Sequence, residues 1–155
     1  MDTGMSSEER VAVGKKLLLL LADTYSIYLK TQNFHWNLKG EHFYSLHLLL
    51  QKLYEELAEA IDELAERIRA LGQYVEAHFA RFSADTCIAG EKHWTTSKDM
   101  VQQLTKDHEA IAKRHRPAIA FAEENHDAPT GDLIIQRIAT HEKAAYLLRS
   151  HLQES

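Results

Sequence analysis

The sequence predicts an all-α protein, a four-helix bundle in one domain that spans residues 1–155. Long stretches rich in Leu, Ala, Glu, Lys and Gln favour helices, and only two prolines and six glycines interrupt the 155 residues. Apolar residues recur at spacings of three, four and seven, which is typical of helices that bury one face. A chain of this length can bury a sizeable core as one domain. Residues 1–6 are expected to form a flexible tail.

The first helix is predicted from about Ser7 to about Trp36, because capping serines and two glutamates open it. Five consecutive leucines at residues 17–21 make its middle apolar nearly all round. We therefore expect neighbours to cover this part on more than one side. The apolar stripe along the helix comprises Val11, Leu18, Tyr25 and Leu29.

The second helix is predicted from about Glu41 or His42 to about Leu71, between the turn residues Gly40 and Gly72. Its spacing is typical of bundle packing. The apolar face comprises Phe43, Leu46, Leu50, Leu53, Leu57, Ala60, Leu64 and Leu71.

A long connection follows at residues 73–96, with a short helix predicted over residues 75–82. A linker of this length can cross the bundle between its second and third helices. The third helix should begin near residues 96–99 and reach Glu124, with a kink at Pro117. After a break at residues 125–131, Thr130 or Asp132 can cap a fourth helix that ends near Leu152.

Charge and cysteine content narrow the classes of function. The net charge of −5 does not suit a general nucleic-acid binder. It suits a protein that attracts cations, although solubility explains a mild acidity equally well. Cys87 is the only cysteine, so no intrachain disulfide can form. The N-terminus resembles no signal peptide, and the leucine run is far shorter than a membrane span of ~20 residues. The cytoplasm is the expected location.

Candidate metal ligands lie within residues 33–67. His35 and His47 are twelve residues apart, and Asp62 and Glu66 are separated by one helical turn. Imidazoles and carboxylates are reasonable ligands for iron, zinc or manganese. At ~100° per residue, His47, Gln51, Asp62 and Glu66 share one face of the second helix.

The length of this helix prevents one chain from completing the site. At ~1.5 Å per residue, His47 and Asp62 are about 22 Å apart along the axis. Two antiparallel copies of the helix, related by a two-fold axis near residues 54–56, would bring His47 of one chain to the carboxylates of the other. Ala58 is small enough to permit this approach, and His35 can join His47 from its own chain. Such an isologous dimer has two equivalent sites.

Ordinary alternatives remain open for each of these residues. A single histidine is most often a surface or core residue without a metal. An acidic pair at this spacing is commonly a solvated helix face, and here Arg67 and Arg69 can pair with it. Trp36, directly after His35, can quench stray oxidising equivalents, but we expect it to pack in the core.

The motif N-F-H-W-N-x-x-G-x-x-F-x-x-L-H at residues 33–47, followed by Y-E-E-L and I-D-E-L-A-E-R, closely resembles the Dps-type miniferritins of the ferritin-like superfamily. The segment AEENHDAPTGDLI resembles their connection between the third and fourth helices. The resemblance covers about residues 10 to 153. It implies a hollow shell of twelve subunits that oxidises ferrous iron at inter-subunit sites, prefers hydrogen peroxide to dioxygen, and stores ferric mineral.

The resemblance assigns His35 and His47 of one subunit, with Asp62 and Glu66 of its partner, as the catalytic iron ligands. Gln51 departs from the family, because many members carry an aspartate or glutamate at this position. A neutral amide is a weaker ligand for a hard cation than a carboxylate. We therefore expect one strong iron position and one weak or water-completed position per site.

Two further expectations come from the resemblance. Asp127 and Asp132, with Glu123 or Glu124, can line a three-fold pore for cations, although acidic residues at helix ends are common.

A DNA-compacting shell with a secondary metal site is the alternative function, and a metal-dependent peroxidase or oxidase that stores little mineral is a second rival. Residues 1–10 contain one arginine against three acidic residues, and the final HLQES has no lysine or arginine. We therefore expect no DNA binding through the tails.

Overall fold

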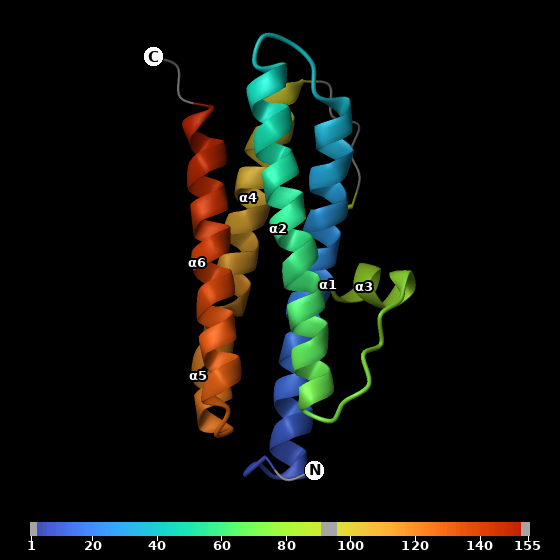
Figure 1. Cartoon of the computed structure of the whole chain (residues 1–155), viewed down its shortest axis with the longest axis vertical. Helices are drawn as coiled ribbons and strands as arrows, with labels where there is room; N and C mark the ends of the chain where they lie inside the picture. The colour runs from blue at the N-terminus through green and yellow to red at the C-terminus, as the bar shows by residue number, and fades with distance from the viewer. Residues whose placement is uncertain (1–2, 91–95, 153–155) are drawn as a thin grey trace.

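The computed structural model describes residues 3–90 and 96–152, which form six helices and contain no strand. Four long helices make a bundle, and two short helices accompany it (Figure 1). The long helices are α1 (Ser7–Asn37), α2 (Phe43–Ala70), α4 (Ser97–His115) and α6 (Ala128–Ser150), and the short ones are α3 (Phe79–Asp85) and α5 (Pro117–Glu124). The predicted all-α bundle is confirmed. The tail predicted for residues 1–6 lies partly outside the described residues, and Ser6 caps α1 in a capping box with Glu9.

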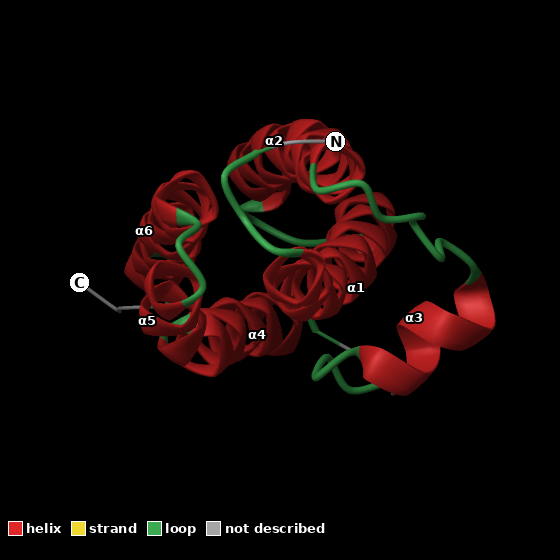
Figure 2. Cartoon of the chain, turned by 90° about the horizontal axis from the view of Figure 1, so that it is seen from below, coloured by secondary structure: helices red, strands yellow, loops and turns green. Residues whose placement is uncertain are grey.

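The chain order places α2 and α4 parallel to each other. In Figure 1, α1 rises from the N-terminus, α2 descends, α4 descends again and α6 rises toward the C-terminus. The segment between α2 and α4 must therefore return along the length of the bundle, and its described part passes outside the four long helices with α3 (Figure 2). The crossover predicted from the length of this connection is confirmed.

Three predicted boundaries differ from the structure. The fourth long helix, α6, begins at Ala128 with Asp127 as its cap, so the break predicted at residues 125–131 and the cap predicted at Thr130 or Asp132 are wrong. The short helix begins at Phe79 rather than residue 75, because the chain before it is not helical and the side chain of His78 caps the helix by accepting a hydrogen bond from the N–H of Arg81. The single third helix predicted to Glu124 is divided into α4 and α5 at Arg116. Pro117 causes this division, because it lacks an N–H and its ring clashes with the preceding turn.

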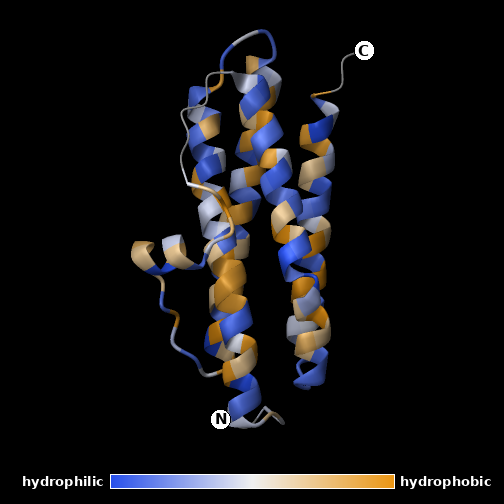
Figure 3. Ribbon diagram, turned by 180° about the vertical axis from the view of Figure 1, so that it is seen from behind, coloured by the Kyte–Doolittle hydropathy of each residue, from blue (hydrophilic) through white to orange (hydrophobic). Residues whose placement is uncertain are grey.

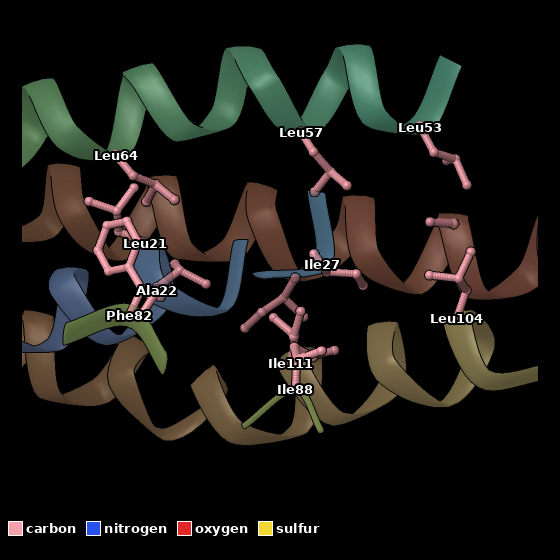
Figure 4. Close-up of a cluster of buried hydrophobic side chains, with 14 of the residues drawn as sticks. Leu21, Ala22, Ile27, Leu53, Leu57, Leu64, Phe82, Ile88, Leu104 and Ile111 are labelled. Atoms are coloured by element: carbon pink, nitrogen blue, oxygen red, sulfur yellow. The ribbon is translucent and has the colours of Figure 1, made fainter. Parts of the chain in front are cut away.

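The core lies between the four long helices. The leucines of residues 17–21 are buried except for Leu19, which is half-buried, so α1 is covered on several sides as predicted. This is the strongly hydrophobic stretch of α1 in Figure 3. Figure 4 shows part of the core, which includes Ile27 of α1, Leu53, Leu57 and Leu64 of α2, and Leu104 and Ile111 of α4. Leu29 and Phe43, both predicted on apolar faces, are exposed. Across the described residues, no helix is both long and apolar enough to cross a bilayer.

Asp23, a buried residue of α1, links the crossover segment to the bundle by hydrogen bonds. Asp23 accepts hydrogen bonds from the Cys87 N–H at 2.6 Å, from Arg114 Nη1 at 2.9 Å and from His115 Nε2 at 2.6 Å. Burial raises the pKa of Asp23, but the hydrogen bonds from His115 and Cys87 and the charges of His115 and Arg114 outweigh burial and lower the pKa overall. The interaction joins α1 and α4 to the segment that follows α3.

Candidate metal centre

The two motif histidines meet at one end of the bundle. His35 lies in the last turn of α1 and is buried, and His47 lies near the start of α2 and is half-buried. The short loop between these helices reverses the chain at Gly40. The φ of this residue is +100°, a left-handed conformation that glycine adopts readily because it has no Cβ. The backbone N–H and C=O of Lys39 bond to the Ser97 hydroxyl at 2.9 and 2.7 Å, which anchors the loop to α4. This connection places two histidines from separate helices side by side.

The histidines orient each other by reciprocal hydrogen bonds. Nδ1 of His35 is 2.9 Å from the backbone oxygen of His47, and Nδ1 of His47 is 3.2 Å from the backbone oxygen of His35. A carbonyl oxygen only accepts, so each Nδ1 carries the proton and donates it. In the neutral form of either ring the lone pair is then on Nε2. A hydrogen bond from the other ring nitrogen commonly fixes the tautomer of a histidine that ligates a metal.

Aromatic contacts hold these rings in place. The His35 and His47 rings stack with centroids 3.7 Å apart and planes at 21°. Tyr54 packs edge-on against His35 at 5.2 Å, and Phe43 packs against His47 at 5.0 Å. Trp36 does not belong to this group. It is 64% exposed, so the prediction that it packs in the core is wrong for the single chain.

The motif carboxylates lie at the other end of α2. Asp62 and Glu66 are exposed, and α2 is continuous between them and His47. Within residues 3–90 and 96–152, no three His, Cys, Asp or Glu side chains gather as metal ligands. The structure therefore brings the histidines together but does not bring the carboxylates to them within one chain. Completion of the site by a second subunit stays a prediction.

The alternative in which neighbouring arginines pair with these carboxylates has no support in the contacts. Arg67 donates to Asp127 Oδ1 at 2.6 Å and to Thr130 Oγ1 at 2.9 Å, and Arg69 donates to the backbone oxygen of Gln73 at 2.8 Å. Neither Asp62 nor Glu66 has a hydrogen bond or ion pair within the part of the chain that the structure describes. Both carboxylates are open to a ligand from outside the chain.

Gln51 lies one turn beyond His47 on α2 and is half-buried. Its Nε2 donates to Glu55 Oε1 at 2.8 Å, one further turn along the helix. The amide therefore uses its donor within the chain and keeps its carbonyl oxygen as the group that can coordinate a cation.

The predicted pore residues differ in their surroundings. Asp127 is buried and caps α6, where it accepts from the Thr130 N–H at 3.1 Å and from Arg67. Its carboxylate thus stabilises the connection between helices, which argues against a lining role. Asp132 is exposed and shares a groove of about 440 Å³ between α2 and α6 with Glu63 and Glu66. Pore lining by Asp132 stays a prediction.

Sequence reasoning missed the reciprocal histidine bonds and the cap at Asp127. The reciprocal bonds depend on the conformation of the loop at Gly40, which spacing along the chain does not specify. The cap had a local signal, because an aspartate three residues before Thr130 and two before Pro129 is typical of a helix start.

Comparison with known proteins supports the resemblance in the sequence. A family model described as a ferritin-like domain matches residues 14–155. The chain is 33% identical over 134 residues to DNA protection during starvation protein 2 of Bacillus anthracis, covering 86% of this chain and 92% of that protein. It is 31% identical over 148 residues to general stress protein 20U of Bacillus subtilis, covering 96% and 99%.

Solved structures agree with this grouping. DpsC from Streptomyces coelicolor superposes with a TM-score of 0.96 at 28% identity, covering 100% of this chain and 91% of that one. Dps from Staphylococcus aureus gives 0.88 at 30% identity, covering 92% and 96%. A Dps protein from Vibrio cholerae, described as a member of a broad superfamily of ferritin-like diiron-carboxylate proteins, gives 0.90 at 26%, covering 96% and 94%. The fold and the match to the ferritin-like family model define a ferritin-like helical-bundle protein. Within that class, the chain belongs to the Dps family.

Proposed function

We propose that this protein is a ferroxidase that consumes hydrogen peroxide and stores the ferric product inside a hollow homo-oligomeric shell, a dodecamer by resemblance to the family. The reciprocal pairing of His35 and His47 carries the proposal, because it stacks two imidazoles and engages Nδ1 of each, which leaves Nε2 of each ring as the nitrogen that can ligate a metal. Asp62 and Glu66 of a partner subunit would complete the site. The diiron-carboxylate description of the Vibrio cholerae protein supports iron as the metal.

Iron is the substrate in this proposal. Two ferrous ions each give one electron to hydrogen peroxide, whose O–O bond breaks, and two protons complete two water molecules. The carboxylates favour the ferric product, since hard oxygen ligands suit the higher charge. The ferric ions then hydrolyse, release protons and join the mineral.

Iron loading tests the proposal. Apo-protein given ferrous iron and peroxide should retain many more ferric ions per subunit than the two that one site can hold. We expect His35→Ala to slow oxidation by more than the ~10–100-fold that loss of a residue supporting a metal ligand typically costs. Stopped-flow absorbance and the iron content of the eluted shell give both quantities, with His42→Ala at an exposed position as the control. Rapid oxidation without retained iron would favour a peroxidase, and normal loading by His35→Ala would refute the assigned site.

Substitution of Gln51 tests the weak second position. The present chain should bind one ferrous ion tightly and one weakly at each site, because the amide supplies no negative charge. Gln51→Asp should tighten the weak position by about 10–100-fold, the scale on which groups around a metal typically act. Anaerobic titration with ferrous iron measures both affinities, and Gln51→Asn is the neutral control. Two equally tight irons in the unsubstituted protein would contradict this expectation.

A further inference from the structure

A line of tyrosine rings begins at the candidate iron site. The Tyr54 ring is edge-on to the His35 imidazole with centroids 5.2 Å apart and planes at 81°. Tyr28 of α1 is edge-on to Tyr54 at 6.3 Å, and Tyr25 follows Tyr28 at 6.1 Å. All three separations lie within the range of aromatic contact. A phenol therefore touches a ligand of the proposed site, and two further phenols extend from it along α1.

The position of Tyr54 is set by the helix that carries the other site residues. Tyr54 is seven residues after His47, so at ~100° per residue it lies within about 20° of the same face of α2. It is half-buried, whereas Tyr44 and Tyr74 are 73% and 80% exposed. Trp36 follows His35 in sequence, but within the described residues its ring does not contact the histidine pair. Among the residues that the structure describes, Tyr54 is thus the phenol whose ring contacts a proposed ligand.

We propose that Tyr54 supplies the second electron for peroxide reduction when only one ferrous ion occupies the site. This inference rests on the proposed ferroxidase function. It addresses a difficulty created by Gln51, because peroxide accepts two electrons and a single ferrous ion provides one. Without a second donor, breakage of the O–O bond would release hydroxyl radical next to the protein.

The chemistry balances with the groups named. One ferrous ion gives an electron to hydrogen peroxide, which yields ferric iron, hydroxide and a hydroxyl-radical equivalent. Tyr54 gives this equivalent one electron and its phenolic proton, which forms water and a neutral tyrosyl radical. A later ferrous ion reduces the radical, and one proton from water restores the phenol. The sum is two ferrous ions oxidised for each peroxide, the same stoichiometry as with two irons bound at once.

Tyr28 and Tyr25 are two further residues to which a radical formed on Tyr54 can move. Both are half-buried and packed against the core, so a radical that moves to them is held within the subunit. Phe82 ends the line, with its centroid 5.3 Å from that of Tyr25, and a phenylalanine ring is much harder to oxidise than a phenol. The radical can therefore reside on Tyr54, Tyr28 or Tyr25.

Freeze-quench electron paramagnetic resonance tests the proposal on the assembled protein. One ferrous ion per subunit is bound anaerobically, and one equivalent of hydrogen peroxide is then added. We expect a tyrosyl signal that decays when more ferrous iron is supplied. Tyr54→Phe should lose the signal and release hydroxyl radical to a spin trap, while ferric absorbance still develops. Tyr44→Phe and Tyr74→Phe, at exposed positions, should behave like the unsubstituted protein.

The outcomes separate this inference from the ferroxidase function. Absence of iron oxidation in the unsubstituted protein would refute the function itself. Normal iron oxidation without a tyrosyl signal, or an equal signal in Tyr54→Phe, would refute the role of Tyr54 alone. Tyr54→Phe removes only a hydroxyl group, and ferric absorbance in the same sample shows that the site still forms.

Discussion

Co-expression of a His35→Ala chain with an Asp62→Ala chain is expected to restore iron oxidation that neither variant retains alone. In a protein assembled from one variant alone, every site lacks the same ligand, either His35 or Asp62. In a mixed dimer, the intact histidines of one chain meet the intact carboxylates of the other, while the second site receives both substitutions. Random pairing makes about half of the dimers mixed, so recovery should reach about a quarter of the unsubstituted rate, because an isologous dimer has two equivalent sites.

The matched control combines His35→Ala with His47→Ala. Both substitutions affect the histidine component, so no mixed dimer contains an intact site and activity should stay absent. Stopped-flow oxidation of ferrous iron measures each preparation, and tags of different size establish the proportion of mixed dimers. Failure of the first pair to recover, with mixed dimers present, would show that the site is not divided between chains as proposed. The expected effect is large, because the control should show almost no iron oxidation while the first pair recovers a sizeable fraction of the unsubstituted rate.

The helices could be predicted because their signals are local. Apolar spacing, with Gly40 and Gly72 as turn residues, located α2 to within two residues at each end, and Pro117 marked the interruption of the third long segment. The start of α3 was missed because its sequence has no strong period and the cap is His78, a residue that seldom serves this role. Burial was harder to predict, since Leu29 is 48% exposed although its spacing matches a buried stripe.

The residues proposed as iron ligands come from residue types, gaps and the family resemblance, which together point to His35, His47, Asp62 and Glu66. Helical rise predicts that one chain separates the histidines from the carboxylates, and α2 is continuous between His47 and Asp62. The tautomers could not be predicted, because the bond between each Nδ1 and the other residue's carbonyl depends on how two helix ends meet. Long-range contacts of this kind have no fixed separation in sequence.

Acid should destabilise the protein through a second histidine pair, which is buried between α4 and α6. Nδ1 of His108 and Nδ1 of His141 are 2.8 Å apart, and each Nε2 has no partner within the described residues. Burial and the nearby charge of Arg137 lower the pKa of His108 to about 3. Burial, with the charges of His108, Arg137 and His115, also lowers the pKa of His141. Both rings are therefore neutral in the folded state.

The direction of the effect follows from proton binding. In the unfolded chain these histidines have a pKa of about 6.5, so below that pH they bind protons that the folded state does not. Their stabilising contribution is complete above about pH 6.5 and is lost as the pH falls toward 3. For His108 alone, a change from pH 7 to pH 5 should lower the free energy of unfolding by about 2 kcal/mol, and the loss continues until the pH falls below about 3.

Denaturant unfolding of the assembled protein at about pH 7 and about pH 5 measures this dependence. The double variant His108→Gln, His141→Gln should show a much smaller loss between the two pH values, because neither position then titrates. Its stability at neutral pH is expected to be lower, since glutamine does not reproduce the packed rings, so the comparison uses the difference between pH values rather than either value alone. His42→Gln is exposed and should keep the full dependence. An unchanged loss in the double variant would assign the acid sensitivity between these two pH values to other groups. Asp23 is not one of them, because its lowered pKa makes its own contribution disappear only at more acidic pH.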